Sequence, residues 1–165
     1  MNLTQAQKTT LKNFINSTPA ILALFNAGDY LGAAAALNAN AAPDFWVWRT
    51  NVSRAEIYHQ TSVDATTWSW TIYKNQSATE QNAWVQMFMN DAANFALPNF
   101  RAGIAVIFAG AAAAQNTHCL AIGRRLASIV EKLLATGTGS TASPATMLSE
   151  GPITGDDVYN AMAVG

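Results

Sequence analysis

The sequence is poor in the residues on which several classes of protein depend. It contains one cysteine, Cys119, and two histidines among 165 residues. A single cysteine excludes a disulfide within the chain and supplies too few thiolates for a metal cluster. The longest apolar stretch, residues 104–114, is interrupted by Gly110 and is shorter than the roughly 18 residues of a membrane-spanning helix. The first residues lack the apolar centre of a signal peptide, so we expect a soluble, cytosolic protein of one domain.

Charge is scarce as well. Lys and Arg total 9 and Asp and Glu total 10, which gives a net charge of −1. A protein whose main task is to grip nucleic acid usually carries a basic surplus, which this chain lacks. The aromatic content of 10% and the hydrophobic content of 50% argue against a disordered acidic chain. With so few charges and an excess of alanine, the chain has few polar side chains for its surface. This favours burial of part of that surface in an assembly.

Helix start signals recur along the chain. Capping boxes, in which Ser or Thr precedes Glu or Gln by three positions, begin at Thr4, Ser53 and Ser77. Thr18 before a proline, Asp29 and Thr154 mark further starts. The expected helices cover residues 4–16, 19–27, 30–38, 54–60, 78–94, 98–109, 117–135 and 155–162.

The longest of these helices, residues 117–135, has the clearest apolar stripe. Its apolar side chains recur at intervals of three and four, at Cys119, Ile122, Leu126, Ile129, Val130 and Leu133. We expect Ile129 and Leu133, at the centre of the stripe, to lie in the core. Replacing such a leucine with alanine costs roughly 2–5 kcal/mol.

Two aromatic segments have no clear helical period. Residues 44–51 are aromatic and alternate poorly, which fits either a strand or a packed loop. Residues 66–73 are β-branched and aromatic and favour a strand with Trp68, Trp70 and Ile72 on one face, although a helix is the rival interpretation.

Residues 137–152 differ from everything before them. They are small, polar and rich in Gly and Pro, so they bury too little surface to fold alone. Yet Met147, Leu148 and Ile153 are apolar and need a pocket. We therefore expect an extended arm that is mobile in an isolated subunit, docks on a neighbour in an assembly, and can be removed without unfolding the rest.

These patterns together predict a mainly α fold. A compact multi-helix bundle, residues 1–136, carries at most a short β element. The extended C-terminal arm, residues 137–165, ends in a short helix.

No constellation of residues predicts catalysis. His59 closes a short helix and is expected to face water, and His118 and Cys119 point about 100° apart as helix neighbours, so they form no Cys–His pair. The GTGST segment, residues 137–141, lacks the lysine of a phosphate-binding loop. The pair Asp156 and Asp157 fits the first turn of a helix. The sequence thus predicts no catalytic residue, no cofactor and no metal.

Tryptophan and arginine, the residues that dominate interface hot spots, offer the best candidate site. Most of the five tryptophans are expected in the core, but Trp46 or Trp48, followed by Arg49, can also anchor an interface. Arginines elsewhere belong either to solvated faces or to salt bridges between subunits. The candidate interface residues are Trp46, Trp48, Arg49, Arg101, Arg124, Arg125, Met147, Leu148 and Ile153.

Three segments resemble a family of small virion proteins of tailed phages and prophages. They are PDFWVWRTNV (residues 43–52), NFRAGIAVIFAG (residues 99–110) and EKLLATGTGSTASPATMLSEGPITGDDV (residues 131–158). In that family the last segment typically reads E-K-L-F-A-T-G-T-G, then P-A-T-M, then an ending of the form E-G-P/x-L-T-x-x-D-V. Leu134 stands where the family usually has Phe, and Leu148 and Ser149 also depart from its common residues.

The resemblance implies a head–tail connector, or adaptor, protein. Such proteins form a ring of about twelve copies beneath the portal, in which each contact between copies is heterologous. The implied partners are further copies of the chain, the portal and tail or neck proteins, with DNA passing through the ring without sequence-specific binding and with no membrane. The implied location is the virion, after synthesis in the host cytoplasm. The alternatives are a tail terminator or tube protein, a decoration or minor head protein, and a small prophage enzyme or inhibitor.

Overall fold

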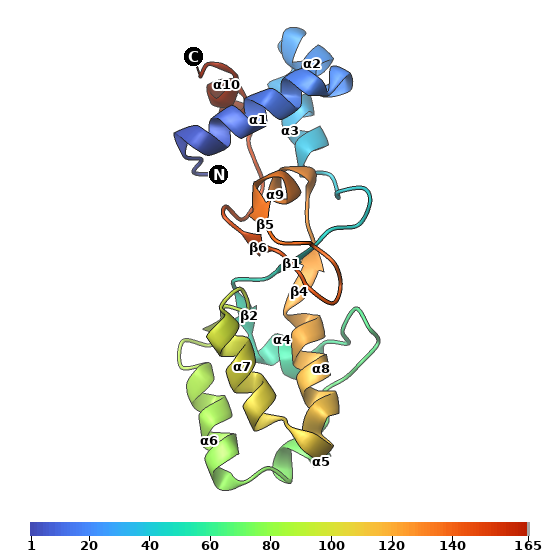
Figure 1. Ribbon diagram of the computed structural model, residues 1–165, viewed down its shortest axis with the longest axis vertical. Helices are drawn as coiled ribbons and strands as arrows, with labels where there is room; N and C mark the ends of the chain where they lie inside the picture. The colour runs from blue at the N-terminus through green and yellow to red at the C-terminus, as the bar shows by residue number, and fades with distance from the viewer. Residues whose placement is uncertain (165) are drawn as a thin grey trace. The chain divides into compact units, whose positions relative to one another are not determined.

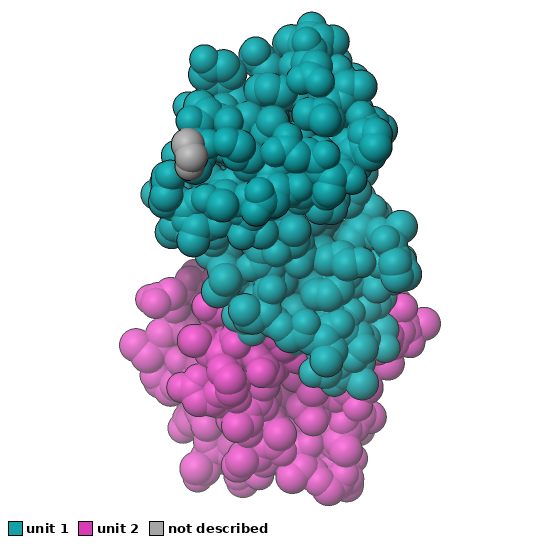
Figure 2. All heavy atoms as spheres, turned by 45° about the horizontal axis from the view of Figure 1, so that its top comes forward, with its two compact units in different colours: residues 1–47, 126–165 teal, residues 48–125 magenta. Residues whose placement is uncertain are grey.

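The chain divides into two compact units in the computed structural model, which describes residues 1–164. Unit 1 combines Met1–Val47 with the chain from Leu126 onward, and unit 2 is Trp48–Arg125 (Figure 2). The chain passes from unit 1 to unit 2 within β1 (Trp46–Trp48) and returns within β4 (Arg124–Leu126). The predicted mainly α character is confirmed, since strands in the described part of the chain are short.

Unit 1 is built from helices at both ends of the sequence (Figure 1). The helices α1 (Gln5–Ser17), α2 (Pro19–Asn26) and α3 (Tyr30–Asn38) begin at the predicted caps, including the Thr4 capping box. The last helix, α10 (Gly155–Met162), packs against α1 and α3, and α9 (Ile129–Leu134) also contacts both. Their buried side chains include Leu11, Ile15, Leu37, Val130, Leu134 and Val158.

The segment expected to be a mobile arm folds onto unit 1. Strand β5 (Ala135–Thr136) pairs antiparallel with β6 (Thr146–Met147), and the amide of Trp46 donates to the carbonyl of Gly139. Gly139 has a φ of +66°, and a Cβ there would lie 2.2 Å from the ring of Phe45. Only glycine fits this position. The structure therefore differs from the expected boundary after residue 136, because the segment finds its packing partners within its own chain.

Two polar side chains hold the later part of this segment. The Asn38 amide group donates to the carbonyl of Ile153 at 2.8 Å and accepts from its N–H at 2.9 Å. The buried carboxylate of Glu131 accepts from the backbone N–H of Ser128 at 3.0 Å and from that of Gly151 at 3.1 Å. These side chains supply hydrogen bonds to the backbone groups of Gly151 and Ile153, which belong to no strand.

Unit 2 is a small helical domain with one short sheet. Its elements are β2 (Val52–Ser53), α4 (Arg54–His59), α5 (Trp70–Lys74), α6 (Ala78–Met87), β3 (Ala92–Ala93), α7 (Pro98–Ile107), the 3₁₀ turn η1 (Gly110–Ala112) and α8 (Ala113–Ile122). Strands β2 and β3 pair antiparallel. The capping boxes at Ser53 and Ser77 and the start at Pro98 are confirmed. The helix from Ser77 ends at Met87 rather than near residue 94, before β3 begins.

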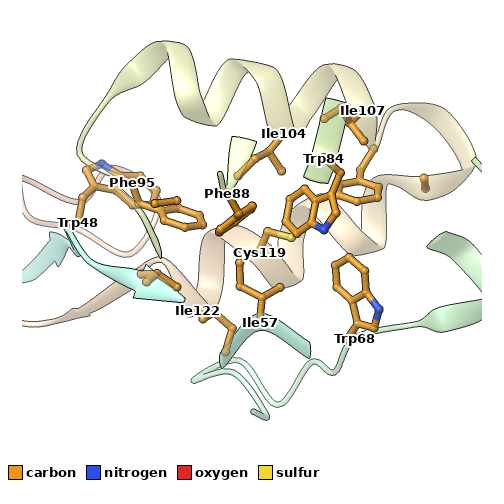
Figure 3. Packing of buried hydrophobic residues seen from close by; sticks show 14 residues of the cluster. Trp48, Ile57, Trp68, Trp84, Phe88, Phe95, Ile104, Ile107, Cys119 and Ile122 are labelled. Atoms are coloured by element: carbon orange, nitrogen blue, oxygen red, sulfur yellow. The ribbon is translucent and has the colours of Figure 1, made fainter. Parts of the chain in front are cut away.

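The core of unit 2 is aromatic (Figure 3). Trp84 is fully buried, its ring stacks on Trp68 with centroids 5.4 Å apart, and its indole N–H donates to the Tyr58 hydroxyl at 2.9 Å. Phe88 and Phe108 contact the same indole. The bulk of the tryptophan surface is thus used for packing, the more common of its two expected roles.

The single long helix expected over residues 117–135 is wrong. The structure has α8, then β4, then α9 in its place. Gly123 ends α8, where a Cβ would lie 2.1 Å from the ring of Phe95. Ser128 then starts α9 with a capping box to Glu131. The break rotates the second half of the stripe, so that Val130 and Leu134 are buried while Ile129 and Leu133 are only partly buried.

The strand favoured for residues 66–73 is also wrong. The rival interpretation holds for its second half, where α5 begins behind Ser69, whose hydroxyl accepts from the N–H of Ile72. Trp68 is buried and Trp70 is 54% exposed, and their rings meet edge to face with centroids 5.8 Å apart.

No single helix among residues 1–164 is long and apolar enough to cross a membrane, and one pair, Pro98–Ile107 with Gly110–Ile122, passes that test jointly with a bend of 112°.

Candidate interaction surfaces

The tryptophan expected as an interface anchor is closed off by an arginine. Trp48 is 8% exposed, and the guanidinium carbon of Arg101 lies 4.4 Å from the centre of its ring. Arg101 also donates to the carbonyl of Phe95. The structure thus joins two candidate residues, from β1 and α7, in a cation–π contact inside unit 2. Trp46, two residues earlier, is partly exposed.

Two other candidate arginines, Arg49 and Arg124, are also engaged within unit 2. Arg49 pairs with Glu56 at 2.5 Å and donates to the carbonyl of Ile122 at 3.2 Å. Burial raises the pKa of the Glu56 carboxyl, but hydrogen bonds from Arg49 and Ser53 outweigh burial, and the net pKa is lowered. Arg124 pairs with Asp64, and Arg125 is partly exposed. A role for Arg49 or Arg124 between subunits would require these internal contacts to be exchanged.

An apolar groove that no sequence pattern predicted lies in unit 1. It encloses about 440 Å³ and is lined by Phe14 of α1, Ala41, Ala42, and Ile129, Lys132 and Leu133 of α9. Lys132 provides its cationic edge, with the ammonium 5.6 Å from the centre of the Phe45 ring. Ile129 and Leu133 were expected in the core, and their partial exposure forms the groove wall. Ile129 and Leu133 are partly exposed because the helix is broken before α9.

Large apolar side chains are exposed in both units. They are Leu31, Tyr159 and Leu148 in unit 1, and Val63, Trp70, Val85, Met89, Leu97 and Val106 in unit 2. Of the three apolar candidates in the expected arm, Met147 and Ile153 are buried within unit 1, whereas Leu148 is 61% exposed. The structure therefore removes Met147 and Ile153 from the accessible surface and leaves Leu148 on it.

His118 belongs to a buried polar cluster rather than to a reactive site. Its Nε2–H donates to the carbonyl of Ile57 at 2.8 Å, and its Nδ1 lies 3.1 Å from the Thr66 hydroxyl, in the tautomer that both contacts favour. Thr66 in turn lies 2.6 Å from the Ser62 hydroxyl. On the same helix, Gln115 accepts from the N–H of Ser69 at 3.0 Å. These bonds fasten the irregular segment after α4 to α8.

We expect His118→Ala to lower the free energy of unfolding by about 1–3 kcal/mol, because it removes the hydrogen bond to the buried carbonyl of Ile57 and one of the two contacts of the Thr66 hydroxyl. The matched control is His59→Ala, since His59 is exposed and its replacement should change stability by less than about 0.5 kcal/mol. Denaturant titration followed by circular dichroism measures both. Equal stability of the two variants would contradict the structural role of His118.

The thiol of Cys119 is fully buried, and burial raises its pKa far above the ordinary value. A thiol held protonated in this way is a poor nucleophile. As predicted, Cys119 is not paired with its neighbour, since the contacts of His118 are to Ile57 and Thr66. Among residues 1–164, no three side chains of His, Cys, Asp or Glu are grouped so as to hold a metal ion.

The groove of unit 1 and the exposed side chain of Leu148 remain accessible for an interaction with another molecule. The arginine and tryptophan candidates contribute chiefly to the folding of unit 2. No protein-family model, curated protein or solved structure matches this chain.

Proposed function

We propose that this chain is a structural head–tail connector, or adaptor, protein of a tailed bacteriophage, and that it forms a ring of about twelve copies between the portal and the tail. The resemblance of residues 43–52, 99–110 and 131–158 to small phage virion proteins supports the family. Its partners are further copies of itself, the portal protein, and tail or neck proteins. Its location is the virion, where DNA passes through the ring without sequence-specific binding.

The exposed apolar surface is the observation that carries the proposal. Leu31, Met89 and Val106 are each about three-quarters exposed, on a chain with only 12% charged residues. A neighbouring surface that covers these apolar side chains would gain free energy by removing them from water. A structural protein that is always surrounded by copies and neighbours covers them permanently.

One uncharged stretch of unit 2 extends this argument. The sequence contains no charged residue between Arg101 and Arg124. The exposed residues between these two arginines are accordingly small or apolar: Ala102, Ala105, Val106, Ala109, Gly110, Ala111, Ala113, Ala114 and Thr117. Small side chains allow close approach of a neighbouring backbone, which favours side-by-side packing of helices from adjacent copies.

The oligomeric state of the purified full chain tests the proposal. We expect sedimentation and negative-stain electron microscopy to show closed rings of about twelve copies, and antibody labelling of particles to mark the head–tail junction. Six-fold rings would favour the tail terminator instead. A monomer at all concentrations, or a monomer with a measurable turnover, would contradict the connector and favour a prophage inhibitor or enzyme.

A further inference from the structure

The groove of unit 1 is shaped and charged for one kind of occupant. Five of its six lining residues are apolar, and the sixth, Lys132, carries a positive charge. An apolar side chain with an acidic residue close by in sequence would bury its surface against Phe14 and Leu133 and place its carboxylate near Lys132. Burial of an aliphatic side chain supplies the affinity, and the charge pair supplies the orientation.

The same chain presents such a side chain. Leu148 is 61% exposed, and Glu150 follows it by two positions. The neighbouring apolar residues, Met147 and Ile153, are buried within unit 1, so Leu148 is the large apolar side chain of this segment that its own chain leaves exposed.

Leu148 is also held in place before any partner arrives. On one side of it, Met147 belongs to β6. On the other side, the Ser149 hydroxyl accepts from the Gln7 side chain at 3.0 Å, and the Gly151 N–H donates to Glu131 at 3.1 Å. A side chain on a fixed segment loses less conformational entropy on binding than one on a free arm.

We propose that Leu148 of one copy inserts into the groove lined by Phe14, Ala41, Ala42, Ile129 and Leu133 of the next copy, with Glu150 beside Lys132. This inference rests on the proposed ring and names the contact that builds it. The two surfaces of the contact are different, so it is heterologous, and repeated copies form a closed ring when the rotation between them closes.

Charge placed on either side of the contact tests it. We expect Leu148→Asp and Leu133→Glu each to raise the concentration for half-maximal assembly at least about tenfold, measured by sedimentation. The matched control is Ala142→Asp, which places the same charge at an exposed residue of the same segment and should change that concentration less than about twofold. Circular dichroism melting of each variant confirms that it is folded.

Cross-linking between singly substituted chains identifies the two partners. Chains carrying Leu148→Cys, mixed with tagged chains carrying Ala42→Cys, should form a disulfide between the two kinds of chain when oxidised, whereas neither alone should form one in comparable yield. The native Cys119 is fully buried and should not compete.

The outcomes separate the contact from the function. Rings that form normally from Leu148→Asp, or a cross-link only between two Leu148→Cys chains, would overturn this contact and leave the ring proposal standing. A wild-type chain that stays monomeric would overturn both.

Discussion

Trp84→Ala is expected to cost about 3–5 kcal/mol of unfolding free energy, the largest loss among the substitutions considered. Trp84 is fully buried, and its ring contacts Trp68, Phe88 and Phe108. The truncation leaves a cavity among rings that cannot collapse around it, and it removes the hydrogen bond to Tyr58. Denaturant titration followed by near-ultraviolet circular dichroism, which reports on packed aromatic rings, measures the loss.

The control is a second tryptophan of the same unit. Trp70 is 54% exposed, so Trp70→Ala should cost no more than about 1 kcal/mol, although its ring touches Tyr58 and Tyr73. If the two variants lost equal stability, the aromatic cluster around Trp84 would not be the core of unit 2.

The second large effect concerns the face of α9 that points inward. Leu134 is 4% exposed and packs with Val130 in the core of unit 1, so Leu134→Ala should cost about 2–5 kcal/mol. Leu133 lines the groove and is partly exposed, so Leu133→Ala should cost about 1 kcal/mol.

These two leucines form a matched pair, since they are adjacent in sequence and undergo the same change. The uninterrupted helix over residues 117–135 would reverse their order, because it places Leu133 in the core. Comparison of the two midpoints of urea unfolding therefore decides between the broken and the continuous helix. A larger loss at Leu133 than at Leu134 would contradict the structure.

The sequence predicted the starts of helices far better than their ends. The boxes at Thr4, Ser53 and Ser77 were found because capping is a local interaction between residues three apart. The Ser128 box has the same pattern, but the apolar stripe running through it favoured one continuous helix. Gly123 and the ring of Phe95, 28 positions apart, make the break, and no window of local sequence contains both.

The candidate surface was predicted only in part, for a related reason. Arginine and tryptophan are frequent in interfaces, but they also often contact each other within one chain. Only the fold shows that Arg101 and Trp48 form such an internal contact. Gly and Pro in residues 137–152 correctly excluded a helix. They did not reveal that Asn38 and Glu131 would supply hydrogen bonds to that segment, because both side chains come from other elements.

The discontinuity of unit 1 has a consequence for how the protein folds during its synthesis. Helices α1, α2 and α3 leave the ribosome first, but α10, which packs against α1 and α3, leaves after all of unit 2. The apolar face around Leu11 and Ile15 therefore lacks its contacts with α10 until unit 2, which precedes α10 in the sequence, has been synthesised. Chaperones that hold unfolded chains bind exposed apolar surfaces of this kind. Slower translation of residues 48–125 should lengthen that interval and increase aggregation of the newborn chain.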